Sequence, residues 1–182
     1  LGCYGDGGAV FTNDATLAQR MRQIRNHGQA KKHDHPVLGL NGRLDTLQAA
    51  ILLAKLEVFE QEIIQRQAVA ERYTAALSNA PLTIPTVATA NSSVWAQYTV
   101  LSPVRDTLRE RLQAEGIPSV SYYAVPLHLQ PVFADLSHKP GDFPVGEQVA
   151  SEGLSLPMSV GLPAEVIERI GRVCANTERA SA

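Results

Sequence analysis

The chain has 182 residues, enough to bury a hydrophobic core as one ordinary domain or two small ones. Hydrophobic residues make up 45% of it and charged residues 19%, and the formal net charge is −2, which argues against a polybasic nucleic-acid-binding or membrane-surface role. No apolar run is long enough to span a bilayer and no signal peptide is recognisable, which favours a cytoplasmic protein.

The only cysteines, Cys3 and Cys174, lie near opposite ends of the chain. Two cysteines so far apart favour reduced thiols over a disulfide scaffold. The chain begins Leu1-Gly2, and its first methionine is Met21. We therefore expect it to be the tail of a longer protein, whose upstream part contributes to any active site.

The first predicted elements follow a glycine-rich segment, Gly5-Asp6-Gly7-Gly8, which is typical of a turn. A short strand is predicted after it, over residues 9–12. A phosphate-binding turn is the alternative, but the segment lacks a GKS/T ending and no helix starts directly after it. Asp14 supplies a cap for a helix over residues 14–26, which Gly28 is placed to end.

Residues 27–36 predict a polar loop that contains three histidines and an aspartate. A zinc site is one hypothesis, but the spacing matches no familiar ligand pattern and no cysteine lies near. An ordered loop over a binding site is the preferred interpretation, because long polar loops between firm elements often carry function.

The longest predicted element is a helix over residues 45–77, opened by the turn pair Asn41-Gly42. Asp45 and Gln48 have the spacing of a capping box. Apolar residues over 47–59 lie on almost every side of this helix, which predicts burial in a large body. Its length predicts a kink, or a bridge between two lobes.

Arg43 lies between this turn and the helix, at the edge of the expected core. Two interpretations stay open for it. The guanidinium either forms a salt bridge within its own fold or belongs to a binding site.

The rest of the chain predicts a small α+β unit after a loop over 81–93, where we place a boundary between lobes. Its expected elements are strands over 97–101 and 119–125, a helix from Ser102 to Gly116, a compact apolar loop over 127–133, a turn over 140–143, and helices over 145–153 and from Pro163 onward.

Several motifs, in this order over essentially all 182 residues, resemble the sugar aminotransferases of the DegT/DnrJ/EryC1/StrS family. They are Gly5-Asp6-Gly7-Gly8-Ala9-Val10-Phe11-Thr12-Asn13-Asp14, His27-Gly28, Asn41-Gly42-Arg43-Leu44-Asp45-Thr46-Leu47-Gln48-Ala49-Ala50, Gln97-Tyr98-Thr99, Pro126-Leu127-His128-Leu129-Gln130-Pro131 and Leu156-Pro157-Met158. Each motif alone is weak, but together they are specific. The resemblance is nearest to enzymes that aminate the 3-keto group of a UDP-N-acetylhexuronic acid for surface polysaccharide, including lipopolysaccharide.

The resemblance implies an α/β fold, the C-terminal part of a fold-type-I transferase that depends on pyridoxal 5′-phosphate (PLP). Residues 1–58 would be the end of the large PLP-binding domain with the start of a linking helix, and residues 59–182 the small α+β domain. The Schiff-base lysine of the family would lie about two residues upstream of Leu1. None of the lysines here (Lys31, Lys32, Lys55 and Lys139) matches that position, so the catalytic residues are unknown within this chain.

Site roles carry over from the resemblance residue by residue. Asn41 would cross the interface of a homodimer to hydrogen-bond the cofactor phosphate of the neighbouring subunit. Arg43 would hold a substrate carboxylate, of glutamate or of the uronic acid, because a planar guanidinium suits two-point carboxylate binding. The remaining expected substrate-binding residues are His27, Tyr122, Tyr123 and His128.

Two departures from the family pattern concern the sugar-binding side. Tyr122 stands where the family usually has histidine, and Ala124 where it usually has proline. Ser159 and Val160 follow Met158 where the family more often has His-Pro or Tyr-Pro. These departures leave the exact sugar open.

Three functions are therefore compared. The preferred one is transfer of an amino group, by way of PLP, from glutamate to a keto-sugar nucleotide. The second is a dehydratase of the same fold that uses pyridoxamine phosphate, in which a histidine replaces the lysine. The third is a non-catalytic fragment that keeps only the small domain and an interface. No metal, nucleic acid or membrane partner is expected.

Overall fold

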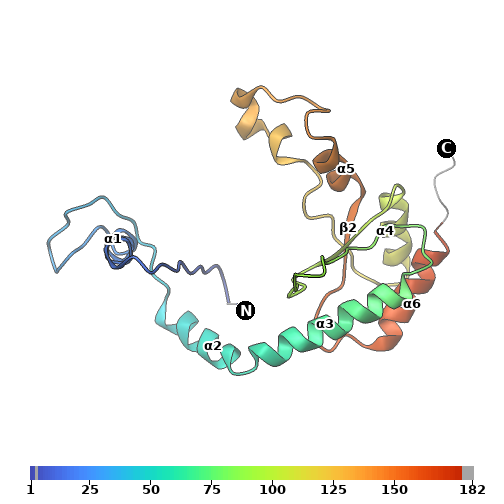
Figure 1. Cartoon of the computed structure of the whole chain (residues 1–182), viewed down its shortest axis with the longest axis horizontal. Helices are drawn as coiled ribbons and strands as arrows, with labels where there is room; N and C mark the ends of the chain where they lie inside the picture. Colours follow the sequence, from blue (N-terminus) through green and yellow to red (C-terminus); the bar gives the residue numbers. More distant parts are fainter. Residues whose placement is uncertain (3, 178–182) are drawn as a thin grey trace. The chain divides into compact units, whose positions relative to one another are not determined.

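The computed structural model describes residues 1–2 and 4–177 of the chain. They divide into two compact units, Leu1–Glu60 and Gln61–Ala182, which are described separately (Figure 1). The expected lobe boundary over 81–93 is wrong, because this segment lies inside the second unit. There Thr83 bridges Leu101, with a backbone hydrogen bond in each direction.

The first unit begins with the predicted helix α1 (Ala15–Arg25). The Asp14 carboxylate accepts hydrogen bonds from the backbone N–H groups of Thr16 (2.8 Å) and Leu17 (3.1 Å), as expected of an N-cap. The Gly28 N–H donates to the Gln23 carbonyl at 2.8 Å and closes the helix end. The strand predicted over 9–12 is wrong, since these residues pair with no strand in the described chain.

The long predicted helix forms as two helices, α2 (Thr46–Leu56) and α3 (Phe59–Ala76). The predicted kink is confirmed at the turn between them, residues 57–58. The predicted burial of the first half is wrong for the described chain. No residue of α2 is buried, and Leu47 and Leu53 are 76% and 66% exposed. Apolar residues do dominate α2, but nothing in the described chain covers them.

The predicted capping box at the start of α2 is also wrong. Asp45 is the N-cap residue by its backbone but makes no side-chain cap hydrogen bond. Gln48 instead pairs with the backbone of Tyr4: its Oε1 accepts from the Tyr4 N–H at 2.9 Å, and its Nε2 donates to the Tyr4 carbonyl. An amide side chain that both donates and accepts therefore anchors the glycine-rich N-terminal segment to α2.

The second unit is built on a two-stranded antiparallel sheet, β1 (Tyr98–Leu101) and β2 (Gly153–Leu156), with Tyr98 opposite Leu156. The strand predicted over 97–101 is confirmed. The strand predicted over 119–125 is wrong except at Val120, which bridges Ser155 with hydrogen bonds of 3.1 and 2.8 Å. The residues after it turn away from the sheet, so no ladder can extend.

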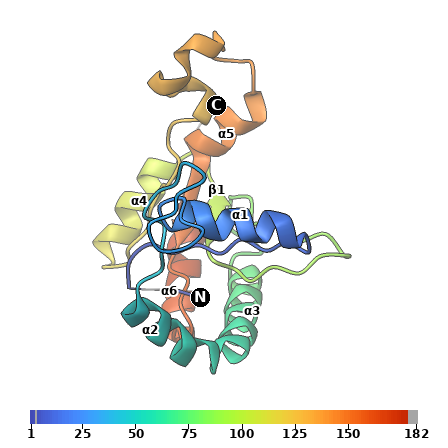
Figure 2. The same cartoon turned by 90° about the vertical axis from the view of Figure 1, so that its left-hand side faces the viewer.

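Helices and short turns complete this unit. They are α4 (Arg105–Ala114), the 3-10 turns η1 (Leu127–Leu129) and η2 (Pro131–Leu136), α5 (Pro144–Glu152) and α6 (Ala164–Ala175). α4 starts later than predicted because Ser102 caps a turn, accepting from the Val104 N–H at 3.3 Å. Figures 1 and 2 both show α5 and the η1–η2 segment at the end of the unit opposite α3.

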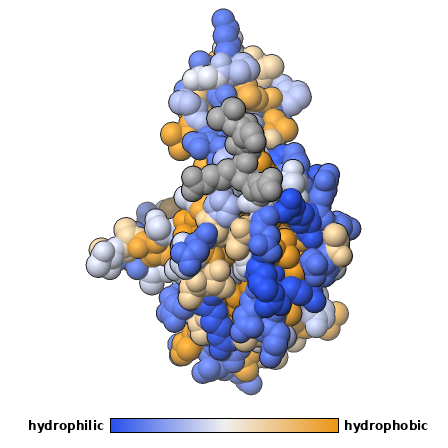
Figure 3. Space-filling model, turned by 90° about the vertical axis from the view of Figure 1, so that its right-hand side faces the viewer, coloured by the Kyte–Doolittle hydropathy of each residue, from blue (hydrophilic) through white to orange (hydrophobic). Residues whose placement is uncertain are grey.

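The core of the second unit lies between the sheet and helices α3, α4 and α6. Its largest fully buried side chains include Tyr73 and Tyr98, whose rings stack at 4.8 Å. Tyr73 donates to the Pro157 carbonyl at 2.8 Å, and Tyr98 shares a hydrogen bond with Thr74 at 3.1 Å. The side of the unit that carries α4 and α6 is hydrophilic over much of its surface (Figure 3). None of the helices in the described residues is long and apolar enough to cross a membrane.

Cys174 is a free thiol in this core, on α6, and Cys3 lies outside the described residues. Burial raises the pKa of the Cys174 thiol to about 12. At pH 8 the reactive thiolate is therefore a very small fraction of this thiol.

We predict that Cys174 does not react with a thiol reagent at pH 8 until the protein unfolds. Comparing the native protein with its Cys174→Ala variant should give the same number of reactive thiols before denaturant and one fewer in the variant after denaturant. A difference of one thiol under native conditions would contradict the burial.

Candidate functional site

The first unit forms a polar site where the end of α1 meets residues 40–43. Three backbone hydrogen bonds join the two segments: Leu40 N–H to the Ile24 carbonyl (2.8 Å), His27 N–H to Leu40 (2.9 Å) and Gly42 N–H to Arg25 (2.8 Å). They fix the backbone on both sides of Asn41, which itself bridges Asn26.

Two glycines allow the chain to cross closely next to this site. Gly28 has φ +71°, and a Cβ added there would lie 1.7 Å from the carbonyl oxygen of Val37. A Cβ on Gly39 would lie 2.0 Å from the Gly28 nitrogen. Both positions therefore require glycine, because the backbone passes too close for a side chain. Gly28 also requires it because of its positive φ.

Arg43 and Asn41 are brought together at this crossing. The Arg43 Nε donates to Asn41 Oδ1 at 3.2 Å, and an Arg43 terminal nitrogen reaches Asn26 Oδ1 at 3.5 Å. None of the ion pairs formed in the described chain includes Arg43, so the salt-bridge interpretation is not borne out there. The guanidinium is exposed and is held in place only by neutral amide oxygens, which leaves its charge uncompensated.

His27 is the third expected residue in this region. It has φ +61°, an uncommon value for a residue with a side chain, and its backbone carbonyl accepts a hydrogen bond from His35 Nδ1 at 2.9 Å. Its side chain is exposed. The described residues hold no group of three or more histidine, cysteine or acidic side chains that could bind a metal ion.

The second unit contains a cavity of about 610 Å³ between the 122–130 segment and α5. Tyr122, Tyr123 and His128, all expected from the sequence, line it together with Phe143. The remaining lining residues are Val125, Pro126, Leu127, Gln130, Gly146, Val149 and Ala150. Among the described residues that line this cavity there is no acidic side chain, lysine or arginine, so it suits a largely neutral ligand group.

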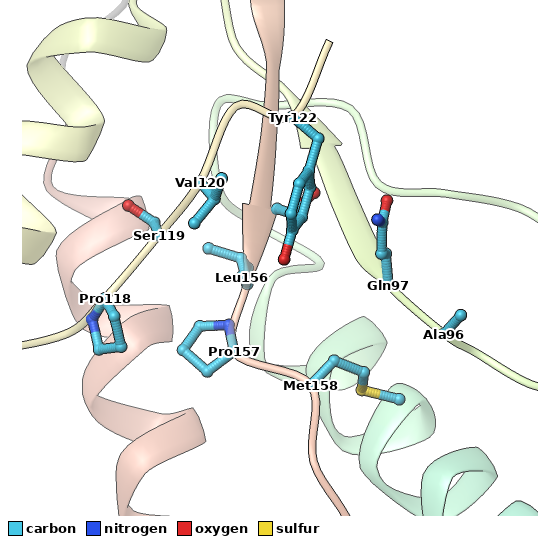
Figure 4. A pocket seen from close by; sticks show the side chains of 10 residues that line it. Ala96, Gln97, Pro118, Ser119, Val120, Tyr122, Leu156, Pro157 and Met158 are labelled. Carbon is cyan, nitrogen blue, oxygen red and sulfur yellow. The ribbon is translucent and has the colours of Figure 1, made fainter. Parts of the chain in front are cut away.

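A smaller cavity of about 220 Å³ lies on the edge of the sheet, and Tyr122 also lines it. Figure 4 shows the ring of Tyr122 between the side chains of Leu156 and Gln97. The ring of Tyr122 therefore forms part of the walls of both cavities. Its hydroxyl has no hydrogen-bond partner in the described chain, and the residue is 55% exposed.

The backbone next to the smaller cavity is strained. Trp95 has φ +50°, which is rare for a bulky residue. The strain is held by two contacts: Arg66 donates to the Trp95 carbonyl at 3.2 Å, and the Trp95 indole N–H donates to Gln67 Oε1 at 2.7 Å. This conformation sets the path of Ala96 and Gln97 into the cavity wall.

His128 and Glu147 form a polar pair at the wall of the larger cavity, with His128 Nε2 at 3.1 Å from Glu147 Oε1. Sequence reasoning selected His128 but missed Glu147. Its only sequence signal is an acidic residue in the first turn of a helix that begins with Pro144, which is ordinarily interpreted as favourable helix charge.

Comparison with known proteins identifies the family. The model of the DegT/DnrJ/EryC1/StrS aminotransferase family matches residues 1–174. The chain belongs to this family. The predicted membership and the mixed helix-and-strand fold of the family are thereby confirmed.

The relatives of this DegT/DnrJ/EryC1/StrS chain include named enzymes. It is 49% identical over 158 residues to a UDP-2-acetamido-2-deoxy-3-oxo-D-glucuronate aminotransferase of Pseudomonas aeruginosa, covering 87% of this chain and 43% of that protein. It is 45% identical over 177 residues to a pleiotropic regulatory protein of Geobacillus stearothermophilus, covering 93% and 48%. The chain spans about half the length of these relatives.

A solved structure matches at a similar coverage. It is S. venezuelae DesV in complex with a ketimine intermediate, with a TM-score of 0.91 and 38% identity. The match covers 95% of this chain and 47% of that one.

We predict that Gly28→Ala disrupts the crossing that places Asn41 and Arg43. The added Cβ cannot avoid the Val37 carbonyl, so the substitution should destabilise the segment by more than about 1 kcal/mol. Hydrogen exchange at the Leu40 and Gly42 amides should accelerate, because both donate across the crossing.

Gly8→Ala is the matched control, since no atom lies within 4 Å of an added Cβ there. Its exchange rates should equal those of the unsubstituted protein. Equal protection in Gly28→Ala would show that the crossing is not what holds this segment.

Proposed function

We propose that this chain is part of a PLP-dependent aminotransferase that moves an amino group from glutamate to a keto-sugar nucleotide. The observation that carries the proposal is the exposed, uncompensated guanidinium of Arg43, fixed beside the amide of Asn41. The match of the aminotransferase family to residues 1–174 supports the same class of reaction.

The donor groups present fit a cofactor phosphate. Asn41 Oδ1 accepts from Arg43, so its side-chain N–H₂ group is left without a partner in the described chain. An amide N–H₂ is a donor that binds a phosphate oxygen without adding charge. Asn41 would thus hold the phosphate of the neighbouring subunit in a homodimer, and PLP, when bound, supplies the chemistry of amino-group transfer.

The homodimer and the domain division also belong to this proposal. Residues 1–58 would complete a large PLP-binding domain and residues 59–182 would be the small domain. The exposed apolar side chains of α2 support a partner surface there, since a monomer seldom leaves several large apolar residues of one helix uncovered.

The substrate would be a UDP-3-keto-N-acetylhexuronate used for surface polysaccharide. The named activity of the Pseudomonas aeruginosa relative supports this choice. Arg43 would bind the carboxylate of the uronic acid or of glutamate, and His27 would line the same site. Tyr122, Tyr123 and His128 would contact the sugar part of the nucleotide. Location in the cytoplasm stays an expectation from the sequence.

The experiment that tests the function uses the full-length protein incubated with PLP and then reduced with borohydride. We expect an intact mass above that of the 182 residues plus one phosphopyridoxyl group, and amino transfer from glutamate to a UDP-3-keto sugar. A protein that gains no adduct and transfers no amino group would be a non-catalytic relative. Conversion that needs pyridoxamine phosphate and forms no lysine adduct would identify the dehydratase.

Two substitutions should separate the roles in the first unit. We predict that Arg43→Ala raises the KM for the carboxylate substrate by about 10- to 100-fold, because a hydrogen bond to a charged group contributes about 1.5–3 kcal/mol. It should leave the PLP dissociation rate unchanged. Asn41→Ala should instead accelerate PLP dissociation from the dimer.

Arg20→Ala is the control for loss of charge, since Arg20 is an exposed arginine of α1 that forms no ion pair or hydrogen bond in the described chain. Unchanged kinetics in Arg43→Ala would show that Arg43 does not bind the substrate carboxylate and has a structural role instead. An unchanged PLP dissociation rate in Asn41→Ala would refute the phosphate contact.

A further inference from the structure

The Glu147 carboxylate makes more hydrogen bonds than an acidic residue needs to stabilise the first turn of a helix. Its two carboxylate oxygens accept from the Gly141 N–H at 2.8 and 2.9 Å, and Oε1 also accepts from the Phe143 N–H at 3.3 Å. The same Oε1 lies 3.1 Å from His128 Nε2. One side chain thus joins the 140–143 turn to η1, and both segments contribute lining residues to the larger cavity.

The electrostatics keep this carboxylate ionised. Its pKa is lowered, first by the backbone hydrogen bond from Gly141 and then by that from Phe143 and by His128. The side chain is 24% exposed and that of His128 only 10% exposed. The ring of Phe143 packs on the His128 ring at 4.8 Å and limits the movement of the imidazole.

An ionised carboxylate fixes the tautomer of a neutral imidazole beside it. The carboxylate can only accept, so when the imidazole is neutral His128 Nε2 carries the hydrogen and Nδ1 keeps a free lone pair. His128 Nδ1 has no hydrogen-bond partner in the described chain. The pair therefore presents one oriented acceptor on a side chain that lines an otherwise largely apolar, uncharged cavity.

We propose that Glu147 is a positioning residue that holds His128 as a hydrogen-bond acceptor for a hydroxyl of a neutral sugar ring in the larger cavity. This inference rests on the proposed function and adds a residue and a ligand group to it. The absence of any cation from the lining disfavours the diphosphate as the occupant, whereas tyrosine and phenylalanine rings suit the apolar faces of a sugar. The ring is either the hexose or the ribose of the nucleotide sugar.

The chain offers a matched control in Asp142. It stabilises the same turn, accepting from the Lys139 N–H at 2.9 Å and lying 3.4 Å from His138 Nδ1. In the described chain it forms no hydrogen bond or ion pair with His128, although the two side chains interact electrostatically. Asp142→Asn therefore loosens the turn and removes a charge near His128, but it leaves the hydrogen bond between His128 and Glu147 in place.

The test uses full-length, PLP-loaded protein and UDP-N-acetylglucosamine as the binding probe, with the Kd measured by calorimetry. We expect Glu147→Gln and His128→Gln each to raise the Kd about three- to tenfold, as loss of one oriented hydrogen bond does. The double variant should bind no more weakly than His128→Gln alone, because Glu147 acts through His128. Asp142→Asn should change the Kd less than about twofold.

A second probe separates the two sugar rings. If Glu147→Gln weakens UDP-N-acetylglucosamine but not UDP, the hydroxyl belongs to the hexose, and if it weakens both alike, it belongs to the ribose. Nitrogen-15 spectra of labelled histidine should show the Nε2–H tautomer for the signal that is lost in His128→Gln. That signal should change more in Glu147→Gln than in Asp142→Asn.

Equal effects of Glu147→Gln and Asp142→Asn on the Kd would overturn the inference, since a loosened turn would then explain both. Additive effects in the double variant, or no binding of the probe by the unsubstituted protein, would overturn it as well. Intact probe binding without amino transfer would refute the proposed function and leave the His128–Glu147 inference standing.

Discussion

The stack of Tyr73 on Tyr98 is the contact on which the second unit depends. It joins α3 to the first residue of β1, and the Tyr73 hydroxyl donates to Pro157 just after β2. Burial raises the pKa of both phenols, so both remain protonated, and Tyr73 remains a hydrogen-bond donor. One aromatic pair thus fixes a helix, both strands and the turn that follows them, and the smaller cavity lies next to this fixed frame, since Leu156 and Pro157 line it.

The cavity walls themselves are held by few contacts. The segment after α4 is attached to the sheet by the Val120–Ser155 bridge and by the Ser121 hydroxyl, which donates to the Gly153 carbonyl at 3.0 Å. Beyond these, the His128–Glu147 pair connects it to α5. A rigid frame that carries loosely attached loops is the usual arrangement of a binding site, because loops can vary while the frame stays constant.

The sequence correctly predicted the elements that depend on interactions between residues close together in the chain. The Asp14 cap, the closing Gly28, strand β1 and helix α6 formed as expected because their signals act within a few residues. The failures involve partners distant in sequence. Gln48 was expected to cap its own helix and binds Tyr4 instead, 44 residues away. Glu147 was missed for the same reason. It lies 19 residues after His128, and no helical or strand repeat in the sequence indicates that the two side chains meet.

The departures from the family pattern have a physical consequence for the proposed recognition of a uronic acid. A phenol at Tyr122 cannot carry a positive charge, whereas the histidine usual at this position can. The larger cavity retains one imidazole, His128, and the Glu147 carboxylate already faces it. No lining residue is therefore left to compensate a substrate carboxylate. Under the proposed function the substrate carboxylate would be bound outside this cavity. Arg43 is our candidate for that contact, because its guanidinium forms no ion pair in the described chain and lies beside Asn41, the predicted cofactor contact.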